Sequence, residues 1–371
     1  MRILNIIQCT NLGGMEQSSL RIAKIMREKG HSYRVISLNS SGEMALLLSQ
    51  EGITTEGIGY HGVFGWRSFF KFKKRLKDVQ ADSLIMTGHN LMAMYALGAL
   101  CSGRRVLAMH YHHAGVKPGW QWRMIYRKAL KTFNSINFVS EYIRQEAISI
   151  LPEIEAASTC IHNPYPLFDP PTPDEKRKNR AALDLPLDCP VIGNAGWLIH
   201  RKRWDVFLHT ADLIRRKIPD AFFVAAGDGP ERPEIERLSR ELGLTGRIKF
   251  LGWRQDMPVF YRAIDVMLFN SDWDAIPSTP LEAISHGVPV VASVINGGLK
   301  EIINSGDAGI LLDNHDTAML ADGVFRIFKD AEYCGKLVAK SRERLKELCD
   351  PDAAADNYLR LLRGKCGGAD R

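Results

Sequence analysis

The amino-acid sequence predicts an α/β protein made of two doubly wound domains. Its 371 residues exceed one ordinary α/β domain. Short apolar runs alternate with helical patterns in both halves, and a proline-rich stretch separates them. Hydrophobic residues make up 45% of the chain and charged residues 25%, which excludes disordered and fibrous proteins. No apolar run reaches the roughly 18 residues of a membrane span, and the start suggests no signal peptide.

Strand and helix patterns alternate through the first 168 residues. The expected strands lie at 3–7, 33–38, 83–86, 105–109 and 136–139, and the expected helices at 15–29, near Met44, at 91–100 and at 120–133. This spacing is typical of a parallel sheet with crossover helices. The first half is therefore expected to form one doubly wound domain.

A linker is expected between the halves, because seven prolines and the charged run DEKRKNR lie between Pro164 and Pro190. Such a composition continues neither a helix nor a central strand. Beyond it the alternation resumes, with strands at 190–195, 221–226, 247–251, 265–269 and 288–292 and helices from Lys202, near Glu234, near Val259 and from Pro280. The amphipathic segment 350–363 can pack on either domain.

Charge and cysteine content limit the partners and the compartment. The seven cysteines are scattered and lack the spacing of metal ligands or redox pairs, which indicates a reducing cytoplasm. Residues 1–168 hold 20 Lys and Arg against 11 Asp and Glu, so the whole positive excess lies in the first half. An anionic partner is expected there: a membrane surface, an anionic acceptor or nucleic acid. Nucleic acid is disfavoured because no binding motif accompanies the charge.

The first chemical motif is the turn at Gly13 and Gly14, between the first strand and a helix. Paired glycines let the backbone approach a ligand, and the N–H groups and dipole of the helix start favour a phosphate. The alternative is a tight turn without a ligand. The complete G-x-G-x-x-G fingerprint is absent, which disfavours a plain NAD enzyme.

The second motif is the stretch 196–205, where Arg201, Lys202 and Arg203 follow a strand and open a helix. Three cations at a helix start can hold a diphosphate through charge-assisted hydrogen bonds. Its place after a strand favours that function, because open α/β sheets bind ligands at the carboxyl ends of their strands. A solvated basic turn is the alternative.

The third motif pairs Asp274 with Glu282 across a short loop that enters a helix. Both carboxylates can accept hydrogen bonds from the hydroxyls of a sugar and a ribose. A structural alternative explains Glu282 without a ligand: Thr279 as N-cap, Pro280 at the first helical position and Glu282 third would form a capping box.

Taken together, these motifs resemble glycosyltransferase family 4. The resemblance rests on the Gly-Gly-x-Glu turn, the Gly-x-Leu-x-x-x-Lys stretch, the acid-x7-Glu pair with its Pro-Val-Val continuation, and Gly297-Gly298 before Glu301. It implies the GT-B fold, with two Rossmann-like domains facing a central cleft, the donor mostly on the second and the acceptor on the first. The implied bounds are 1–168 plus a returning helix at 351–371, a linker at 169–189, and a donor domain at 190–350.

The resemblance also assigns roles to single residues. The backbone at Gly13 and Gly14 would contact the donor diphosphate or its sugar, and Lys202 would contact the diphosphate. Asp274 would contact the donor sugar, and Glu282 the ribose. His110, at the end of the strand 105–109, would touch the donor sugar near the reacting carbon. The implied catalytic residues are His110, Lys202, Asp274 and Glu282. The implied donor-binding residues are Gly13, Gly14, Arg201, Lys202, Gly252, Asp274, Ala275, Ile276, Ser278, Thr279 and Glu282.

Three residues depart from the family pattern. Trp197 stands where a phosphate-binding arginine is usual, so Arg201 or Arg203 is expected to replace it. Asp274 is one methylene shorter than the usual glutamate, and Pro277 removes the N–H of a usual glycine. Contacts to the donor sugar are therefore expected to differ in detail.

No metal ion and no other cofactor is expected. Asp272-Trp273-Asp274 spells the Asp-x-Asp metal signature of the other large glycosyltransferase fold, but that signature belongs to a single-domain context. His110, His112 and His113 lack a carboxylate or cysteine at metal-ligand spacing. The nucleotide sugar itself is a substrate.

A basic helix at 66–79 is the expected membrane contact. Phe69, Phe72, Leu76 and Val79 share the face expected to be buried. The proposed contact set mixes aromatics and cations: Trp66, Phe70, Lys71, Lys73, Lys74 and Lys77. Such faces suit an anionic membrane interface, although a solvated helix with its aromatics folded inward is the alternative. A second basic patch spans 117–131.

The expected function is retaining transfer of a hexose-type sugar from a nucleotide sugar, with UDP the commoner nucleotide, to a hydroxyl of a glycan or lipid-linked acceptor. Such an enzyme would serve cell-surface polysaccharide or glycolipid synthesis from the cytoplasm, peripherally at the inner face of the membrane. Two alternatives remain: a nucleotide-sugar epimerase of the same fold, and a catalytically silent protein that binds sugar nucleotides or glycans. Donor turnover distinguishes them.

Overall fold

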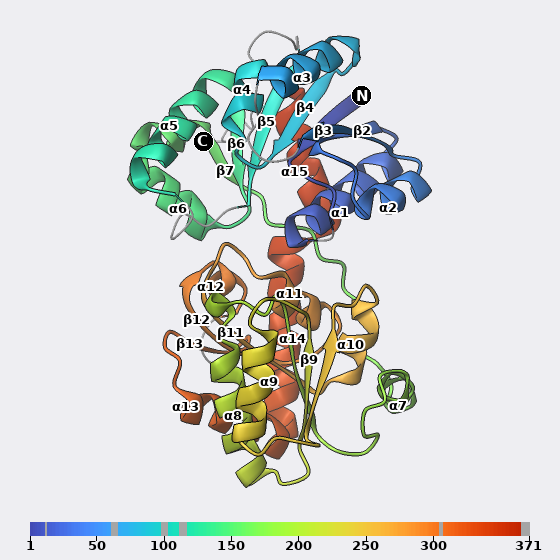
Figure 1. Cartoon of the computed structure of the whole chain (residues 1–371), viewed down its shortest axis with the longest axis vertical. Coiled ribbons are helices and arrows are strands. Elements are labelled where there is room, and N and C mark those ends of the chain that lie inside the picture. The colour runs from blue at the N-terminus through green and yellow to red at the C-terminus, as the bar shows by residue number, and fades with distance from the viewer. Residues whose placement is uncertain (12, 61–65, 98–102, 111–116, 304–306, 365–371) are drawn as a thin grey trace. The chain divides into compact units, whose positions relative to one another are not determined.

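The computed structural model divides the chain into two compact units, each built on its own parallel sheet (Figure 1). The first unit comprises Met1–Pro164 and Cys349–Arg371, and the second comprises Tyr165–Leu348. The structure describes residues 1–11, 13–60, 66–97, 103–110, 117–303 and 307–364. Two Rossmann-like units confirm the predicted fold class.

The first sheet has seven strands in the spatial order β3-β2-β1-β4-β5-β6-β7. They are β1 (Arg2–Ile7), β2 (Ser32–Asn39), β3 (Thr54–Tyr60), β4 (Ser83–Thr87), β5 (Arg104–Met109), β6 (Ser135–Phe138) and β7 (Ser158–Cys160). All pairs are parallel, and β1 pairs with both β2 and β4. The order of the strands therefore reverses between β1 and β4, which is where open α/β sheets place their ligands.

Helices cover this sheet (Figure 1). They are α1 (Gly14–Glu28), α2 (Met44–Gln50), α3 (Trp66–Asp78), α4 (Leu91–Leu97), α5 (Gly119–Thr132), α6 (Glu141–Ile150), the 3-10 helix η1 (Pro152–Ala157) and α15 (Pro351–Arg363). The C-terminal helix α15 packs beside α1 and against β4 and β5. It buries Ala355 and Leu362, and the hydroxyl of Tyr358 accepts a hydrogen bond of 2.9 Å from the amide of Asn137. The last helix therefore belongs to the first unit.

The second sheet has six strands in the order β10-β9-β8-β11-β12-β13. They are β8 (Val191–Ala195), β9 (Phe222–Ala226), β10 (Ile248–Gly252), β11 (Val266–Asp274), β12 (Val290–Gly297) and β13 (Ile310–Leu312). Its helices are α7 (Pro173–Ala182), η2 (His200–Lys202, 3-10), α8 (Trp204–Lys217), α9 (Arg232–Glu241), α10 (Met257–Ala263), α11 (Ser278–Ser285), α12 (Leu299–Ile302), α13 (Thr317–Lys329) and α14 (Ala331–Cys349).

The core of the second unit explains why these strands form. Apolar side chains of β8, β9 and β11 are fully buried at Ile192, Phe223 and Val266. They meet the apolar stripes of α8 and α13, on which Phe207 and Leu320 are also fully buried. Burial on both faces is what a parallel sheet between two helical layers requires.

The segment 169–189, expected as a linker, packs within the second unit. Helix α7 begins there because Thr172 and Glu175 form a capping box and Pro173 stands in the first turn, where its missing N–H costs nothing. The buried guanidinium of Arg180 donates to the carbonyl oxygens of Ala263, Leu187 and Cys189 and to Asp265. The expectation that this composition excludes a helix was therefore wrong. The chain passes between units at Pro164–Tyr165.

Candidate functional site

The switch point of the second sheet brings two of the predicted motifs together. The order of the strands reverses between β8 and β11, which are neighbours. The turn η2 follows β8 and carries Arg201 and Lys202, while Asp274 is the last residue of β11. Both motifs therefore lie at the carboxyl ends of adjacent strands, where this class of sheet binds ligands.

Lys202 and Asp274 form an ion pair at this point. The ammonium nitrogen of Lys202 lies 2.5 Å from a carboxylate oxygen of Asp274, and the side chains are 13% and 14% exposed. The hydroxyl of Ser271 donates to the same carboxylate at 3.0 Å. Lys202 also lies 4.8 Å from the centre of the Phe269 ring. The sequence gives no sign of Ser271 or Phe269, because both contacts arise from the fold of β11.

Burial and charge act against each other on this pair. Burial would raise the pKa of Asp274, but the cations of Lys202 and Arg201 and the bond from Ser271 hold that pKa below its usual value. Burial lowers the pKa of Lys202, and Asp274 opposes that shift. The carboxylate is therefore ionised, and the lysine has a charged partner in a place with little water.

Arg201 and Arg203 take different partners. Arg201 donates to the carbonyl oxygen of Trp273 at 3.1 Å and lies 3.4 Å from Asp274, with its guanidinium 4.5 Å from the centre of the Trp273 ring. Arg203 instead donates from Nε and Nη2 to the two carboxylate oxygens of Asp205 and from Nη1 to Asp272. Arg201 is therefore the cation that shares Asp274 with Lys202.

The helix after Asp274 begins two residues earlier than expected. Helix α11 starts at Ser278, and Pro277 occupies the N-cap position without a side-chain cap. The capping box expected from Thr279 and Glu282 does not form, because both residues already lie inside the helix. Glu282 accepts a hydrogen bond of 2.8 Å from the hydroxyl of Tyr261 instead. Tyr261 lies on α10, and nothing in its sequence surroundings marks it as a partner.

The loop between Asp274 and α11 is packed against a glycine turn. Ala275 and Ile276 are buried, and the N–H of Gly298 donates to the carbonyl oxygen of Ala275 at 3.1 Å. A Cβ at Gly297 would lie 2.2 Å from the carbonyl oxygen of Asp274, so only glycine fits there. The paired glycines before Glu301 thus fix the loop. Ser278 and Thr279 open α11 and are only partly buried.

The predicted donor residue Gly252 ends β10 beside the same edge of the sheet. Its carbonyl oxygen accepts a hydrogen bond of 2.8 Å from the N–H of Gly227, which follows β9. The next residue, Trp253, meets Trp197 edge to face at 5.9 Å, and both indoles are about half exposed. An aromatic pair therefore occupies the place where a phosphate-binding arginine was expected.

In the first unit, the Gly13–Gly14 turn opens α1 as predicted. Gly13 is the N-cap, and its N–H donates to the carbonyl oxygen of Asn11 at 3.2 Å. Gly14 is the first helical residue, where N–H groups have no intrahelical acceptor. A Cβ at Gly13 would lie 2.5 Å from a carboxylate oxygen of Glu16. Glu16 is buried, and burial raises its pKa. The thiol of Cys9 donates to Glu16 at 3.2 Å.

His110 follows β5 at the carboxyl edge of the first sheet. Burial lowers its pKa from 6.5 to about 4, so the imidazole is neutral at neutral pH. It borders a cavity of about 20 Å³ with Asn5, Tyr33, Thr87 and Tyr358. Asn5 in turn accepts from Thr87 at 3.0 Å and donates to Ser19 at 2.6 Å. The two histidines that follow, at 112 and 113, lie outside the described residues.

A larger cavity of about 470 Å³ lies at the switch point of the first sheet. Polar groups line one part of it: Gln8, which follows β1, Asn90, which precedes α4, and Lys117 and Gln121 near the start of α5. The amide of Gln8 donates to Asn39 at 3.0 Å and accepts from Asn90 at 3.1 Å. The apolar lining residues of the cavity include Met86, Leu91, Met92 and Met124.

The predicted membrane helix α3 forms, and Phe72 and Leu76 are buried on one face as expected. Phe70 is 60% exposed, and Lys74 and Lys77 are exposed beside it. Lys71 differs from the expectation, because its ammonium donates to the carbonyl oxygen of Ile58 at 2.6 Å. The side chain of Trp66 lies outside the described part of the chain.

Exposed aromatic residues continue onto the helices that follow α3. Helix α3 packs on α4 and α4 packs on α5. Tyr95 on α4 is 52% exposed and Trp120 on α5 is 66% exposed. The sequence of α5 holds Arg123, Arg127, Lys128 and Lys131 and no acidic residue. The described helices include none that is long and apolar enough to span a bilayer.

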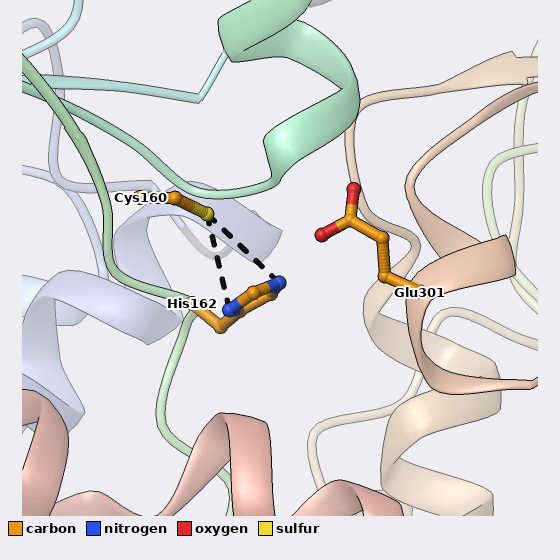
Figure 2. A group of neighbouring side chains, drawn as sticks. All are labelled: Cys160, His162 and Glu301. Atoms are coloured by element: carbon orange, nitrogen blue, oxygen red, sulfur yellow. Dashed lines mark hydrogen bonds between the residues drawn. The ribbon is translucent and has the colours of Figure 1, made fainter.

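Figure 2 shows Cys160, the last residue of β7, and His162, which follows that strand in the first unit. The sulfur of Cys160 lies 3.9 Å and 4.0 Å from the ring nitrogens of His162. Glu301, drawn in the same figure, belongs to α12 of the second unit. Within either unit taken alone, the described residues gather no three potential metal ligands.

Two protein-family models match this chain, one in each half of the sequence. The model described as Glycosyltransferase Family 4 matches residues 12–167, and the model described as Glycosyl transferases group 1 matches residues 175–344. The lipopolysaccharide core biosynthesis glycosyltransferase LpsE of Rhizobium meliloti (strain 1021) is 31% identical over 187 residues, which cover 50% of this chain and 54% of that protein. An uncharacterized glycosyltransferase of Haemophilus influenzae is 22% identical and covers 91% of this chain and 93% of its own length.

The first of these matches, like a second one to LpsD of the same organism, spans about half the length of the relative. Among solved structures, Anabaena Alr3699/HepE in complex with UDP has a TM-score of 0.85 at 20% identity, covering 98% of this chain and 100% of that one. The same protein in complex with UDP-glucose also gives 0.85. At this level of identity the likeness shows a shared fold.

Proposed function

The chain belongs to glycosyltransferase family 4, group 1, and from this premise we propose that it is a retaining glycosyltransferase that uses a UDP-sugar. The observation that carries the proposal is the Lys202–Asp274 pair at the switch point of the second sheet. In this pair the ammonium of Lys202 can bind phosphate, and the adjacent carboxylate of Asp274 can accept hydrogen bonds from sugar hydroxyls. The UDP and UDP-glucose complexes of a protein with this fold support the choice of nucleotide.

In the proposed donor site, Lys202 and Arg201 bind the diphosphate. Arg201 supplies the charge that Trp197 does not, because it lies beside Asp274 and is 32% exposed, whereas Arg203 is held by two carboxylates. Glu282 binds the ribose, and Tyr261 orients its carboxylate. Ala275, Ile276, Ser278 and Thr279 border the donor sugar, and Gly252 lies near the base. In the first unit, the start of α1 at Gly13 and Gly14 stabilises phosphate charge, and neutral His110 accepts or donates one hydrogen bond to the sugar.

The proposed reaction forms a bond between the acceptor oxygen and the anomeric carbon and breaks the bond from that carbon to the phosphate oxygen. Both events occur on the same face of the sugar, so the configuration is retained. The proton of the acceptor hydroxyl passes to the departing phosphate, and the products are the glycoside and UDP. Lys202, Arg201 and the helix start stabilise the charge that builds on the phosphate.

These cations also support a reaction without a metal ion or another cofactor. We expect sugar transfer to continue at full rate when EDTA is added. Loss of activity in EDTA with recovery on adding Mg²⁺ or Mn²⁺ would contradict this part of the proposal.

For the acceptor we propose the cavity of about 470 Å³ in the first unit. Amide groups such as Gln8 and Asn90 suit the hydroxyls of a sugar, and Lys117 suits an anionic group. Methionines 86, 92 and 124 form an adaptable apolar wall. This combination fits an amphipathic, lipid-linked or anionic glycan. Lipopolysaccharide synthesis by LpsE, a relative over half its length, is consistent with that class.

We further propose that the exposed aromatic and basic residues of α3 and α5 dock on an anionic membrane surface and so reach such an acceptor. Phe70 and Trp120 supply apolar contacts, and Lys73, Lys74 and Lys77 supply charge. The protein would then act at the inner face of the membrane.

Incubation with UDP- and GDP-sugars tests the proposed activity against its alternatives. We expect release of nucleoside diphosphate from a UDP-sugar by the wild type and little release by Glu282→Ala. An epimerised sugar nucleotide without release would favour an epimerase. Binding without any turnover would favour a silent binding protein.

A further inference from the structure

Arg203 has a backbone conformation that residues with a Cβ rarely adopt. Its φ of 45° and ψ of 51° lie in the left-handed region. Among the described residues, Asp184 is the only other non-glycine residue with a positive φ. Arg203 also stands directly between Lys202 and the first residue of α8. Strained residues of this kind persist where surrounding contacts hold them, and they gather at ligand sites.

The side chain of Arg203 supplies those contacts. Its Nε and Nη2 atoms donate to the two carboxylate oxygens of Asp205 at 3.0 Å and 2.9 Å. Its Nη1 donates to Asp272 at 3.2 Å. One guanidinium thus joins the start of α8 to β11, and we call Arg203, Asp205 and Asp272 the clamp. Such two-sided contacts fix direction as well as distance.

The β11 end of the clamp is itself held in place. His315 lies 3.0 Å from Asp272 through Nε2 and 2.6 Å from the hydroxyl of Ser293 through Nδ1. Ser293 donates to Asn270 at 2.9 Å. Asp272 is therefore anchored to β12 and to the segment after β13, so it provides a fixed point for the guanidinium.

The geometry couples the clamp to the lysine next to it. Asp272 and Asp274 are two residues apart at the carboxyl end of β11. Asp272 accepts a hydrogen bond from Arg203, and Asp274 accepts one from Lys202. Two consecutive residues after β8 are therefore each bound by one aspartate of β11. The hydroxyl of Ser271, which donates to Asp274, also lies 3.1 Å from the carbonyl oxygen of Arg201.

We propose that Arg203 is a positioning residue for the donor site: the clamp holds the η2 turn so that the ammonium of Lys202 is aligned for the diphosphate before the donor arrives. Arg203 itself does not touch the donor, since its guanidinium is taken by two carboxylates. The inference rests on the proposed function, and it adds a residue that acts through Lys202.

Replacement of Arg203 by glycine separates the backbone from the clamp. Glycine adopts the left-handed conformation without strain, so Arg203→Gly should fold and keep its melting temperature within a few degrees, while the clamp is lost. Arg203→Lys keeps the positive charge but cannot donate two parallel hydrogen bonds to Asp205. Asp272→Asn weakens the anchor without changing its size. Asp184→Gly is the matched control, because it relieves the other left-handed residue and leaves the clamp intact.

The measurement is the dissociation constant for UDP, by calorimetric titration of the full chain, together with KM for the UDP-sugar. We expect Arg203→Gly to weaken UDP binding about tenfold, Asp272→Asn and Arg203→Lys to weaken it less, and Asp184→Gly to match the wild type. Equal affinity of Arg203→Gly and the wild type overturns the inference while leaving the proposed function intact. If the wild type itself binds no nucleoside diphosphate, the proposed function fails, and the inference fails with it.

Discussion

The ammonium of Lys202 lies 2.5 Å from the carboxylate of Asp274, although 71 residues separate them in the chain. The strand order places them together, because β8 and β11 are neighbours in the sheet. Lys202 lies in the turn after β8, and Asp274 is the last residue of β11. The pair is mostly buried, so each group depends on the other for its charge.

Removal of one member of this pair should destabilise the second unit. Asp274→Leu leaves Lys202 poorly solvated beside Arg201, and we expect a loss of about 3 kcal/mol in the free energy of unfolding. The double variant Lys202→Met, Asp274→Leu should lose less than the sum of the single changes, because it leaves no unpaired charge. Urea denaturation of the four proteins measures this coupling. Additive losses would show that the two groups are independent.

Tyr261 should act through Glu282. Tyr261→Phe removes the hydroxyl that donates to Glu282 at 2.8 Å and frees the carboxylate to turn. We expect KM for the UDP-sugar to rise roughly threefold to tenfold, which corresponds to about 1 kcal/mol. The same change in a Glu282→Ala background should have no further effect. Tyr333→Phe on α14 serves as a control. If Tyr261→Phe raised KM as much in the Glu282→Ala background as in the wild type, Tyr261 would not act through Glu282.

His110 should make the protein sensitive to acid. Its pKa falls from 6.5 to about 4 on folding, so the unfolded chain binds more protons between these values. Its contribution to stability is complete above pH 6.5 and is lost as the pH falls toward 4. We expect the difference in unfolding free energy between wild type and His110→Gln to shrink by on the order of 1–2 kcal/mol from pH 7.5 to pH 5. A pH-independent difference would contradict the neutral, buried histidine.

Exposed residues of α3 and α5 should control membrane binding. We expect sedimentation with phosphatidylglycerol vesicles at low salt and none with phosphatidylcholine vesicles. Lys74→Glu with Lys77→Glu should reduce binding by tenfold or more, since each basic group near such a surface contributes about 1 kcal/mol. Phe70→Ser with Trp120→Ser should weaken it as well, whereas Met319→Ser, also exposed but in the second unit, should not. Absence of wild-type binding would refute docking.

Much of the fold follows from the sequence because short apolar runs are buried on both faces, as in β8 and in residues 266–269 of β11. The missed strands are the short or glycine-containing ones: β3 holds Gly57 and Gly59, and β7 and β13 have three residues each. Helix α7 was missed because its charged composition outweighed the Thr172–Glu175 capping box in the prediction.

Some features of the candidate site were predicted from the sequence, and others were not. The resemblance assigned Lys202 and Asp274 to one donor, and the structure places the two side chains in contact because the strand ends meet at one edge of the parallel sheet. The partners of Glu282 and Arg203 were not predicted, because Tyr261 and Asp272 reach them through tertiary packing that no local pattern encodes. The capping prediction for Glu282 was wrong for a related reason, since the observed start of α11 at Ser278 places Thr279 inside the helix.

A calorimetric titration of UDP into the wild type and into Lys202→Met tests the proposed donor site most directly, with circular dichroism to confirm that both proteins are folded. We expect the wild type to bind UDP and Lys202→Met to bind it at least tenfold more weakly, as loss of a charge-assisted contact of about 1.5–3 kcal/mol requires. Equal binding by a folded Lys202→Met protein would contradict the proposed donor site.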